Sequence, residues 1–287
     1  MKYYRVQREC QPRLVADDGE NAYDLTSAHD GLDSFSALAR AADRGNRGLD
    51  ELASEYTAEA DVVEVDGSEL GLPVEPPEVW AAGVTYKISE EAREEESDDP
   101  DVYMNVYQSE RPEVFFKATR SRTVGPGDDV GIRGDSDWDV PEPELGVVLH
   151  REEVVGFTIG NDVSSRSIEG ENPLYLPQAK TYDRCCSLGP CVASTGSIED
   201  PHDLEMTMTI ERDGEILYEE STNTGEMVKT CEQLASYYTR HNAIPETAVL
   251  LTGTALVPSS DFTLRPGDDI AIQIEDIGTL ENGVTTV

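Results

Sequence analysis

Three carboxylates in one part of the chain have the types and spacing to bind a metal ion. Glu142 and Glu144 lie two residues apart at the start of an apolar, strand-like run, and Asp162 follows the next apolar run, 154–159. Because successive side chains of a strand point to opposite faces, both glutamates should lie on one face. Three oxygen ligands with no His or Cys nearby suit a hard divalent ion, Mg²⁺ first, with Mn²⁺ or Ca²⁺ next.

The same pattern has a structural alternative, because the chain is strongly acidic. It has 59 Asp and Glu residues against 22 Lys and Arg residues, and a formal net charge of −37. A Glu-x-Glu pair is expected by chance in such a chain and would then mark a solvated strand face. The apolar surroundings of the pair, and the polar cluster 161–166 after the second run, favour the metal site.

The lysines are the second set of candidate functional residues. The chain has only five, and two of them, Lys117 and Lys180, fall in the motif segments given below. An acidic, lysine-poor chain is typical of proteins adapted to molar internal salt, where charge repulsion is screened. A lysine retained under that bias favours a functional role, since its pKa can fall on burial and allow proton transfer. For Lys117 the alternative is a structural ion pair with a buried carboxylate.

Ordered motifs over roughly residues 78–287 resemble those of the fumarylacetoacetate hydrolase family. They are 83–86 (GVTY), 111–117 (RPEVFFK), 141–145 (PEPEL), 156–166 (GFTIGNDVSSR), 180–183 (KTYD), 188–190 (LGP), 253–254 (GT), 264–269 (LRPGDD) and 277–282 (IGTLEN). The resemblance implies an α+β fold with a mixed β-sheet rolled on itself, and a homodimer or homotetramer. It also implies that Glu142, Glu144 and Asp162 are Mg²⁺ ligands and that the substrate is a 2-oxo acid chelating the metal.

One departure from the hydrolytic members narrows the expected activity. Those members usually carry a His-Glu pair shortly after the Gly-x-x-Tyr segment, but residues 86–93 (YKISEEAR) contain no His. The only histidines of the chain are His29, His150, His202 and His241. The run 160–180 resembles instead the branch containing 2-dehydro-3-deoxy-D-arabinonate dehydratase, which removes water from a sugar-derived 2-oxo acid and yields 2,5-dioxopentanoate.

These residues allow a dehydration mechanism. The metal would stabilise the enolate that forms when a C3 proton is removed. Lys180 is the first choice for proton transfer at C3, and Glu113 for protonating the departing C4 hydroxyl, a role that needs a carboxyl pKa raised by burial; the two roles can be exchanged. The candidate substrate-binding residues are Arg166, Thr254, Lys117, Thr85 and Tyr86.

Three functions of different class follow. The leading hypothesis is a Mg²⁺-dependent lyase that dehydrates a 2-keto-3-deoxypentonate in xylose or arabinose breakdown. The second is another reaction on a 2-oxo acid at the same metal site, such as acylpyruvate hydrolysis with water activated by Glu90 or Glu91, oxaloacetate decarboxylation or tautomerisation. The third is a non-enzymatic metal- or ligand-binding protein, which the retained lysines disfavour.

The rest of the composition excludes several classes of protein. No apolar run approaches the ~20 residues of a membrane span, and the first residues lack the apolar part of a signal peptide, so we expect a cytoplasmic location. The negative charge disfavours nucleic acid and membrane surfaces as partners. The five cysteines show no Cys-x-x-Cys spacing, so neither a disulfide framework nor a zinc site is expected.

The chain is expected to divide into a small N-terminal α+β domain (1–70), a proline-rich linker (71–78) and a catalytic domain (79–287). The patterns predict helices at 34–42 and 226–240, the second with a capping box formed by Asn223 and Glu226. They predict strands at 206–210, 249–252 and 270–274 and turns at 126–129 and 266–269. The acidic run 94–101 is expected to be a solvated loop.

Overall fold

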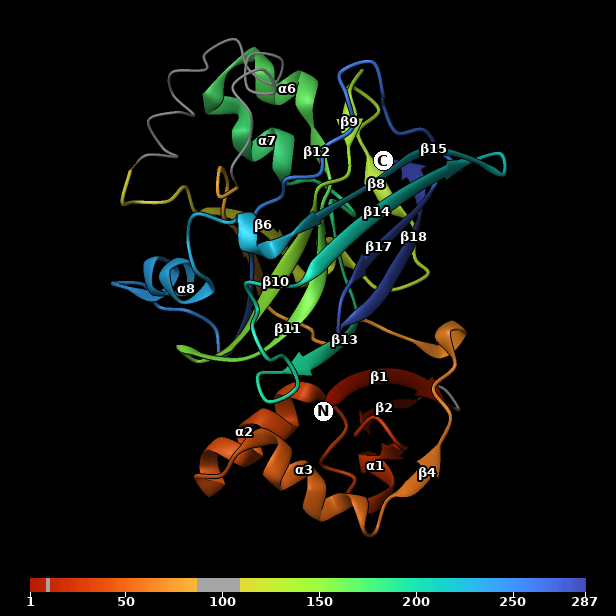
Figure 1. Ribbon diagram of the computed structural model, residues 1–287, viewed down its shortest axis with the longest axis vertical. Helices are drawn as coiled ribbons and strands as arrows, with labels where there is room; N and C mark the ends of the chain where they lie inside the picture. Colours follow the sequence, from red (N-terminus) through yellow and green to blue (C-terminus); the bar gives the residue numbers. More distant parts are fainter. Residues whose placement is uncertain (9–10, 87–108) are drawn as a thin grey trace.

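The structure, a computed structural model, describes residues 1–8, 11–86 and 109–287. Over these ranges the fold is α+β, with three sheets and short helices (Figure 1). The acidic run 94–101 and the candidate residues Glu90 and Glu91 lie outside the described residues.

The largest sheet runs through the whole molecule. Its strand order is β4-β3-β2-β1-β13-β11-β10-β16-β5-β6, and β7 pairs with β13. Most neighbours are antiparallel, but β16 with β5 and β13 with β7 are parallel, so the sheet is mixed, as predicted. The strands are β1 (Lys2–Arg8), β2 (Gln11–Asp17), β3 (Ala22–Asp24), β4 (Asp61–Val63), β5 (Glu78–Ala81), β6 (Phe115–Thr119), β7 (Thr123–Val124), β10 (Pro143–His150), β11 (Glu153–Asp162), β13 (Cys186–Ser194) and β16 (Thr247–Leu251).

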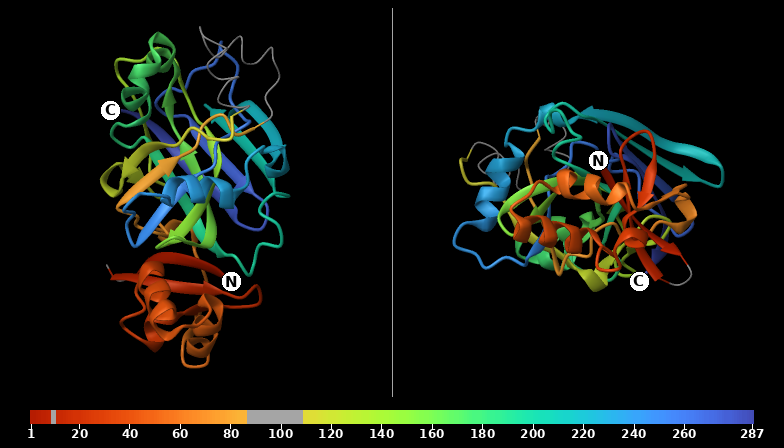
Figure 2. Two further views of the ribbon diagram at one scale, coloured as in Figure 1. Left: turned by 90° about the vertical axis from the view of Figure 1, so that its left-hand side faces the viewer. Right: turned by 90° about the horizontal axis from the view of Figure 1, so that it is seen from below.

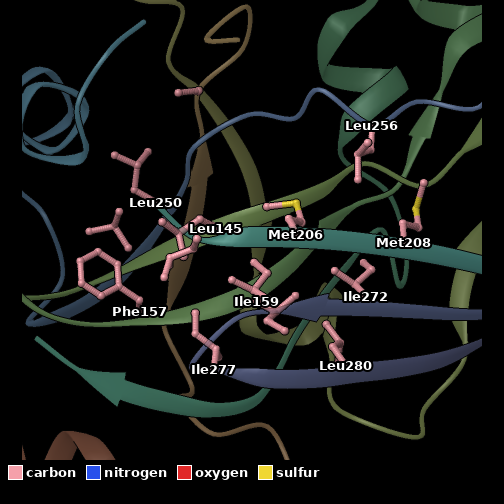
Figure 3. Close-up of a cluster of buried hydrophobic side chains, with 14 of the residues drawn as sticks. Leu145, Phe157, Ile159, Met206, Met208, Leu250, Leu256, Ile272, Ile277 and Leu280 are labelled. Carbon is pink, nitrogen blue, oxygen red and sulfur yellow. The ribbon is translucent and has the colours of Figure 1, made fainter. Parts of the chain in front are cut away.

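A second sheet packs on one face of the first and encloses the main core. Its order is β15-β14-β17-β18-β8, with strands β8 (Val130–Ile132), β14 (Glu205–Arg212), β15 (Glu215–Asn223), β17 (Asp269–Ile274) and β18 (Gly278–Thr286). Leu145 of β10 and Ile159 of β11 belong to one apolar cluster with Met206, Ile272 and Leu280 of this sheet (Figure 3). A two-stranded sheet of β9 (Asp139–Val140) and β12 (Ser164–Ser165) completes the set.

Residues 1–8 and 11–70 pack at one end of the molecule, below the rest of the sheet in Figure 1 and in the left view of Figure 2. Their helices are α1 (Leu25–Ala28), α2 (Phe35–Gly45), α3 (Leu49–Thr57) and the 3₁₀ turn η1 (Gly67–Glu69). The helix predicted at 34–42 is α2, whose N-cap Ser34 accepts a hydrogen bond from the Ala37 N–H. Because β1 pairs with β13, one sheet continues across the predicted boundary, and the division at 71–78 stays a prediction.

Short helices lie at the opposite end of the sheet, where the candidate site is. They are α6 (Arg166–Glu171), the 3₁₀ turn η3 (Pro173–Tyr175) and α7 (Leu176–Lys180), which follow β12 directly (Figure 1). Another 3₁₀ turn, η2 (Arg120–Arg122), follows β6. Lys180 is the last residue of α7, and its side chain lies near Asp162, the last residue of β11.

The predicted helix 226–240 begins later than expected. Residues Thr224–Glu226 form the 3₁₀ turn η4, which Asn223 caps, and the helix is α8 (Cys231–Thr239). Its capping box consists of Thr230 and Gln233. The chain between the two is held out of helical geometry, since the Val228 N–H donates to the Thr85 carbonyl at 2.8 Å. The capping box predicted at Asn223 and Glu226 was therefore wrong. The buried face of α8 consists of Cys231, Leu234, Ala235 and Tyr238.

The remaining local predictions agree with the structure. The strands predicted at 206–210, 249–252 and 270–274 correspond to β14, β16 and β17, and the turns at 126–129 and 266–269 lead into β8 and β17. The four described cysteines are free and buried. Among the described residues, no helix has the length and apolar character needed to span a membrane.

Candidate metal and proton-transfer site

The register of the β10–β11 hairpin brings the three predicted carboxylates together. Pro143 faces Asn161 and Glu144 faces Gly160, so Glu142, just before β10, faces Asp162. The Asp162 N–H donates to the Glu142 carbonyl at 2.9 Å, which continues the ladder to this pair. Residues opposite each other on antiparallel strands point to one face, and Glu144, two residues along, shares it.

The three side chains fit a divalent cation. All are buried, and one carboxylate oxygen from each lies within 4.8 Å of the others. Glu142 Oε1 and Asp162 Oδ2 have no aligned hydrogen-bond donor. Burying carboxylate oxygens without a hydrogen-bond donor costs free energy of folding unless a cation or a proton lies between them. The donor set, oxygen only, is that of Mg²⁺.

Three cationic side chains surround the acidic cluster. Lys180 Nζ donates to Glu142 Oε2 at 2.8 Å and lies 3.6 Å from Asp162 Oδ2. Arg166 Nη2 lies 3.1 Å from Glu142 Oε1, in an ion pair without hydrogen-bond alignment. Lys117 Nζ is 2.5 Å from Asp162 Oδ1. Arg166 and both lysines are thus brought to the predicted metal site.

Lys117 has the geometry of a structural ion-pair partner. Its side chain is 0% exposed, and besides Asp162 it donates to the carbonyls of Val163 at 2.9 Å and Lys180 at 2.5 Å. An ammonium group has three donors, and all three are occupied. This arrangement matches the structural alternative for Lys117, and its predicted role in substrate binding stays untested.

The surroundings shift the pKa values of two of the carboxylates, Glu142 and Glu144, in opposite directions. Burial alone would raise the pKa of Glu142, but Lys180 and Arg166 lower it to about 2. Burial, with the charges of Asp162 and Glu142, raises the pKa of Glu144 well above its usual value, although the Gly253 N–H donates to Glu144 Oε2 at 2.5 Å. Burial would lower the pKa of Lys180, but the charges of Asp162 and Glu142 raise it above its usual value.

Glu113, the second predicted proton-transfer residue, lies against Gly83. A Cβ added at Gly83 would be 2.1 Å from Glu113 Oε2. Only a glycine allows the carboxylate to approach so closely. Burial, and next the charge of Glu169, raise the pKa of Glu113 to about 7, while Lys180 acts in the opposite direction. A carboxyl group with this pKa can donate or accept a proton near neutrality.

The other predicted substrate-binding residues have different surroundings. The Thr85 hydroxyl donates to the Thr252 carbonyl at 2.5 Å, and Thr254 Oγ1 accepts from the Leu256 N–H at 3.1 Å. Both hydroxyls are thus used by the backbone. The Tyr86 hydroxyl is buried without a hydrogen-bond partner, and burial followed by the charge of Glu144 raises its pKa.

Three residues of the site were not predicted from the sequence. Ser164 Oγ accepts a hydrogen bond from Lys180 Nζ at 2.7 Å, and the Gly253 N–H donates to Glu144. The charge of Glu169 raises the pKa of Glu113. Ser164 lies two residues after Asp162 in the polar cluster, which was a usable signal. The contacts of Gly253 and Glu169 depend on chain segments more than fifty residues away, and local spacing carries no information about them.

Comparisons with known proteins place this fold and site in a family. The family "Fumarylacetoacetate (FAA) hydrolase C-terminal" matches residues 78–285. The chain belongs to this family. The match spans both strands of the acidic hairpin, Lys117, Lys180 and Glu113.

Three relatives refine the comparison. The chain is 61% identical, over 100% of both chains, to a Haloferax volcanii protein named "Probable 2-keto-3-deoxyxylonate dehydratase". It is 44% identical to the 2-dehydro-3-deoxy-D-arabinonate dehydratase of Saccharolobus solfataricus, over 72% of each chain. A solved structure of 2-keto-3-deoxy-D-arabinonate dehydratase, complexed with magnesium and 2,5-dioxopentanoate, matches with a TM-score of 0.85 and 34% identity, covering 100% of this chain and 99% of that one. The predicted fold and the predicted branch of the family are confirmed.

Proposed function

We propose that this chain is a lyase that dehydrates a 2-dehydro-3-deoxy-D-pentonate, derived from arabinonate or xylonate, to 2,5-dioxopentanoate. The observation that carries the proposal is the pairing of two proton-transfer groups, Lys180 and Glu113, with a buried set of oxygen ligands. A hydro-lyase needs one group to remove the C3 proton and another to protonate the C4 hydroxyl. The names of the relatives, and the magnesium and product in the related structure, support the same reaction.

The charge of the cluster suits an anionic substrate. Lys117, Lys180 and Arg166 together balance the formal charges of the three carboxylates. A bound divalent cation would therefore give this cluster of six side chains surplus positive charge, which attracts the carboxylate of a 2-oxo acid. Mg²⁺ held by Glu142, Glu144 and Asp162 would act as a Lewis acid for the negative charge that develops on the 2-oxo oxygen.

The residues of this chain would move the protons. Lys180 would take the proton from C3 as the neutral amine, a form that a cation bound by Glu142 and Asp162 favours, because it offsets the two negative charges that raise the pKa of the lysine. The contacts of Lys180 with Glu142 and Ser164 hold it in place. Glu113 donates its proton to the C4 hydroxyl, the C4–O bond breaks, and water leaves. The exchanged assignment, with Glu113 at C3 and Lys180 at C4, is the alternative. The product of this step is an enone that carries a hydroxyl group on C5, and its tautomerisation gives the 5-aldehyde.

Other residues of the site would position these groups. Arg166 would orient Glu142, and Lys117 would fix Asp162. Thr85, Tyr86 and Thr254 would line the site beside Glu144, next to Gly253, whose N–H binds that carboxylate. We further propose that the protein is a cytoplasmic homodimer or homotetramer. Size-exclusion chromatography with light scattering tests the assembly, and a monomer would overturn it.

The test of the reaction is product analysis by mass spectrometry. The purified protein is incubated with 2-keto-3-deoxyxylonate in molar KCl, with Mg²⁺ and then with a chelator. We expect metal-dependent loss of one water and a semialdehyde that a dehydrogenase oxidises to 2-oxoglutarate. No turnover of this substrate, but conversion of oxaloacetate or an acylpyruvate, would overturn the proposed reaction in favour of another one at the same metal site.

A further inference from the structure

Glu169 is a half-buried acid of the site, with a buried Oε2, that the reaction above does not use. It lies in α6, three residues after Arg166, the first residue of that helix. Residues three apart on a helix lie on the same face. Because Arg166 reaches Glu142 at 3.1 Å, the same face of α6 carries Glu169 one turn farther along the site.

Glu169 differs from the other acids of the site in what it contacts. Lys180 donates to Glu142, Gly253 donates to Glu144, and Lys117 pairs with Asp162. Like Glu142 Oε1 and Asp162 Oδ2, Glu169 Oε2 is buried and has no hydrogen-bond partner among the described residues, but Glu169 does not belong to the group of acids that could hold a cation. A buried acceptor without a donor costs free energy, so such an atom at a binding site is explained by a donor that the ligand brings.

Electrostatic effects place Glu169 on the Glu113 side of the site. After burial, Glu169 is the strongest influence on the pKa of Glu113 and exceeds Glu142 and Asp162. At Lys180 the order is reversed, and Glu169 ranks behind both of them. Glu169 therefore acts on the site from the side of Glu113, on the face of α6 that also carries Arg166.

The groups of the proposed substrate can be assigned to these residues in turn. Its carboxylate and 2-oxo group belong at the triad, C3 at Lys180 and the C4 hydroxyl at Glu113. The next group is the C5 hydroxyl, which is a hydrogen-bond donor. We propose that the Glu169 carboxylate accepts a hydrogen bond from the C5 hydroxyl, and so selects polyhydroxylated 2-oxo acids over analogues that end in a methyl group. This inference rests on the proposed dehydration.

The experiment compares two substrates that differ only at C5. They are 2-keto-3-deoxyxylonate and its 5-deoxy analogue, a 4-hydroxy-2-oxopentanoate of the same C4 configuration. The variants are Glu169→Leu, which removes the acceptor, Glu169→Gln, which keeps an acceptor without charge, and Glu171→Gln, a control at an exposed position of the same helix. The readout is kcat/KM for each substrate, with circular dichroism to check the fold.

We expect Glu169→Leu to lower kcat/KM for the pentonate about tenfold or more, the loss typical of a hydrogen bond to a charged group. It should change the value for the 5-deoxy analogue less than about threefold, so the preference for the hydroxylated substrate disappears. Glu169→Gln should lose part of this preference and Glu171→Gln none. If Glu169→Leu does not fold, the partial and selective loss in Glu169→Gln becomes the deciding measurement.

Equal losses on both substrates would overturn the inference, because Glu169 would then act through Glu113 or through the fold. Unchanged kinetics of the Glu169 variants would also overturn it, and would indicate that a water satisfies Oε2. Failure of the wild-type protein to dehydrate either substrate is a different result, since it would overturn the proposed function itself.

Discussion

The close approach of Glu113 to Gly83 predicts a loss of activity from the smallest of substitutions. In Gly83→Ala the new Cβ would be 2.1 Å from Glu113 Oε2, whereas real Cβ contacts essentially never fall under 3.0 Å. The carboxylate must therefore move by about 1 Å, and a displacement of that size can cost about 100-fold in rate. We expect kcat/KM for dehydration to fall about 100-fold, equivalent to about 2.7 kcal/mol of transition-state stabilisation.

Stability should not change in parallel. The atom that must move is the end of a flexible side chain, and Gly83 does not have a positive φ, so alanine fits the backbone. We expect a melting temperature equal to or above that of the wild type, since alanine reduces the entropy of the unfolded chain. The matched control is Gly67→Ala, where an added Cβ has no neighbour within 4 Å.

A double variant shows whether the effect acts through Glu113. Dehydration is followed with a coupled dehydrogenase that oxidises the semialdehyde. The variant Gly83→Ala/Glu113→Gln should be no slower than Glu113→Gln alone, because residues that act as a unit do not have additive effects. Activity of Gly83→Ala within threefold of the wild type, or additive losses in the double variant, would refute the reasoning.

Four other measurements test the site and the surface. If Glu113 donates a proton, kcat/KM should fall tenfold per pH unit above its pKa of about 7 and level off below it; a rise with pH would give Glu113 the role of base. Lys117→Met removes the 2.5 Å ion pair of buried Asp162 and leaves it only the longer, 3.6 Å contact with Lys180, so urea unfolding should show a loss of about 3–5 kcal/mol, and a loss under 1 kcal/mol would contradict the structural role. Mg²⁺ at about 100 times its Kd should stabilise the wild type by about 2.7 kcal/mol in thermal unfolding, and Glu144→Gln should respond much less. Unfolding measured against KCl concentration should show lower stability in dilute buffer, since a net charge of −37 is then unscreened, and full stability there would disprove salt adaptation.

The acidic triad could be predicted from the sequence because its geometry is local. The spacing of Glu142 and Glu144 sets a common face in any strand, and a hairpin of two apolar runs brings Asp162 opposite. The approximate positions of α2, β14, β16 and β17 likewise follow from periodicity and turn residues within each segment.

The remaining features depend on tertiary contacts. Helix α8 begins later than predicted because the Val228 N–H donates a hydrogen bond to the carbonyl of Thr85, a residue that no local pattern connects with Val228. The three contacts of Lys117 include two backbone carbonyls, and backbone acceptors leave no trace in the residue types around them. The pairing of Gly83 with Glu113 is similar, since a glycine at that position is compatible with many turns.

The residues that would bind the cation and those that would transfer protons come from different segments of the chain. All three carboxylates come from one hairpin of adjacent strands, whereas Lys117, Glu113 and Lys180 come from β6, the segment before it and α7. Substitutions in the latter segments can change which proton moves without altering the ligands of the anchoring cation. A scaffold built in this way can evolve new reactions on 2-oxo acids by exchanging residues around an anchor that stays constant, because binding of the substrate head and chemistry at its tail are encoded in different parts of the sequence.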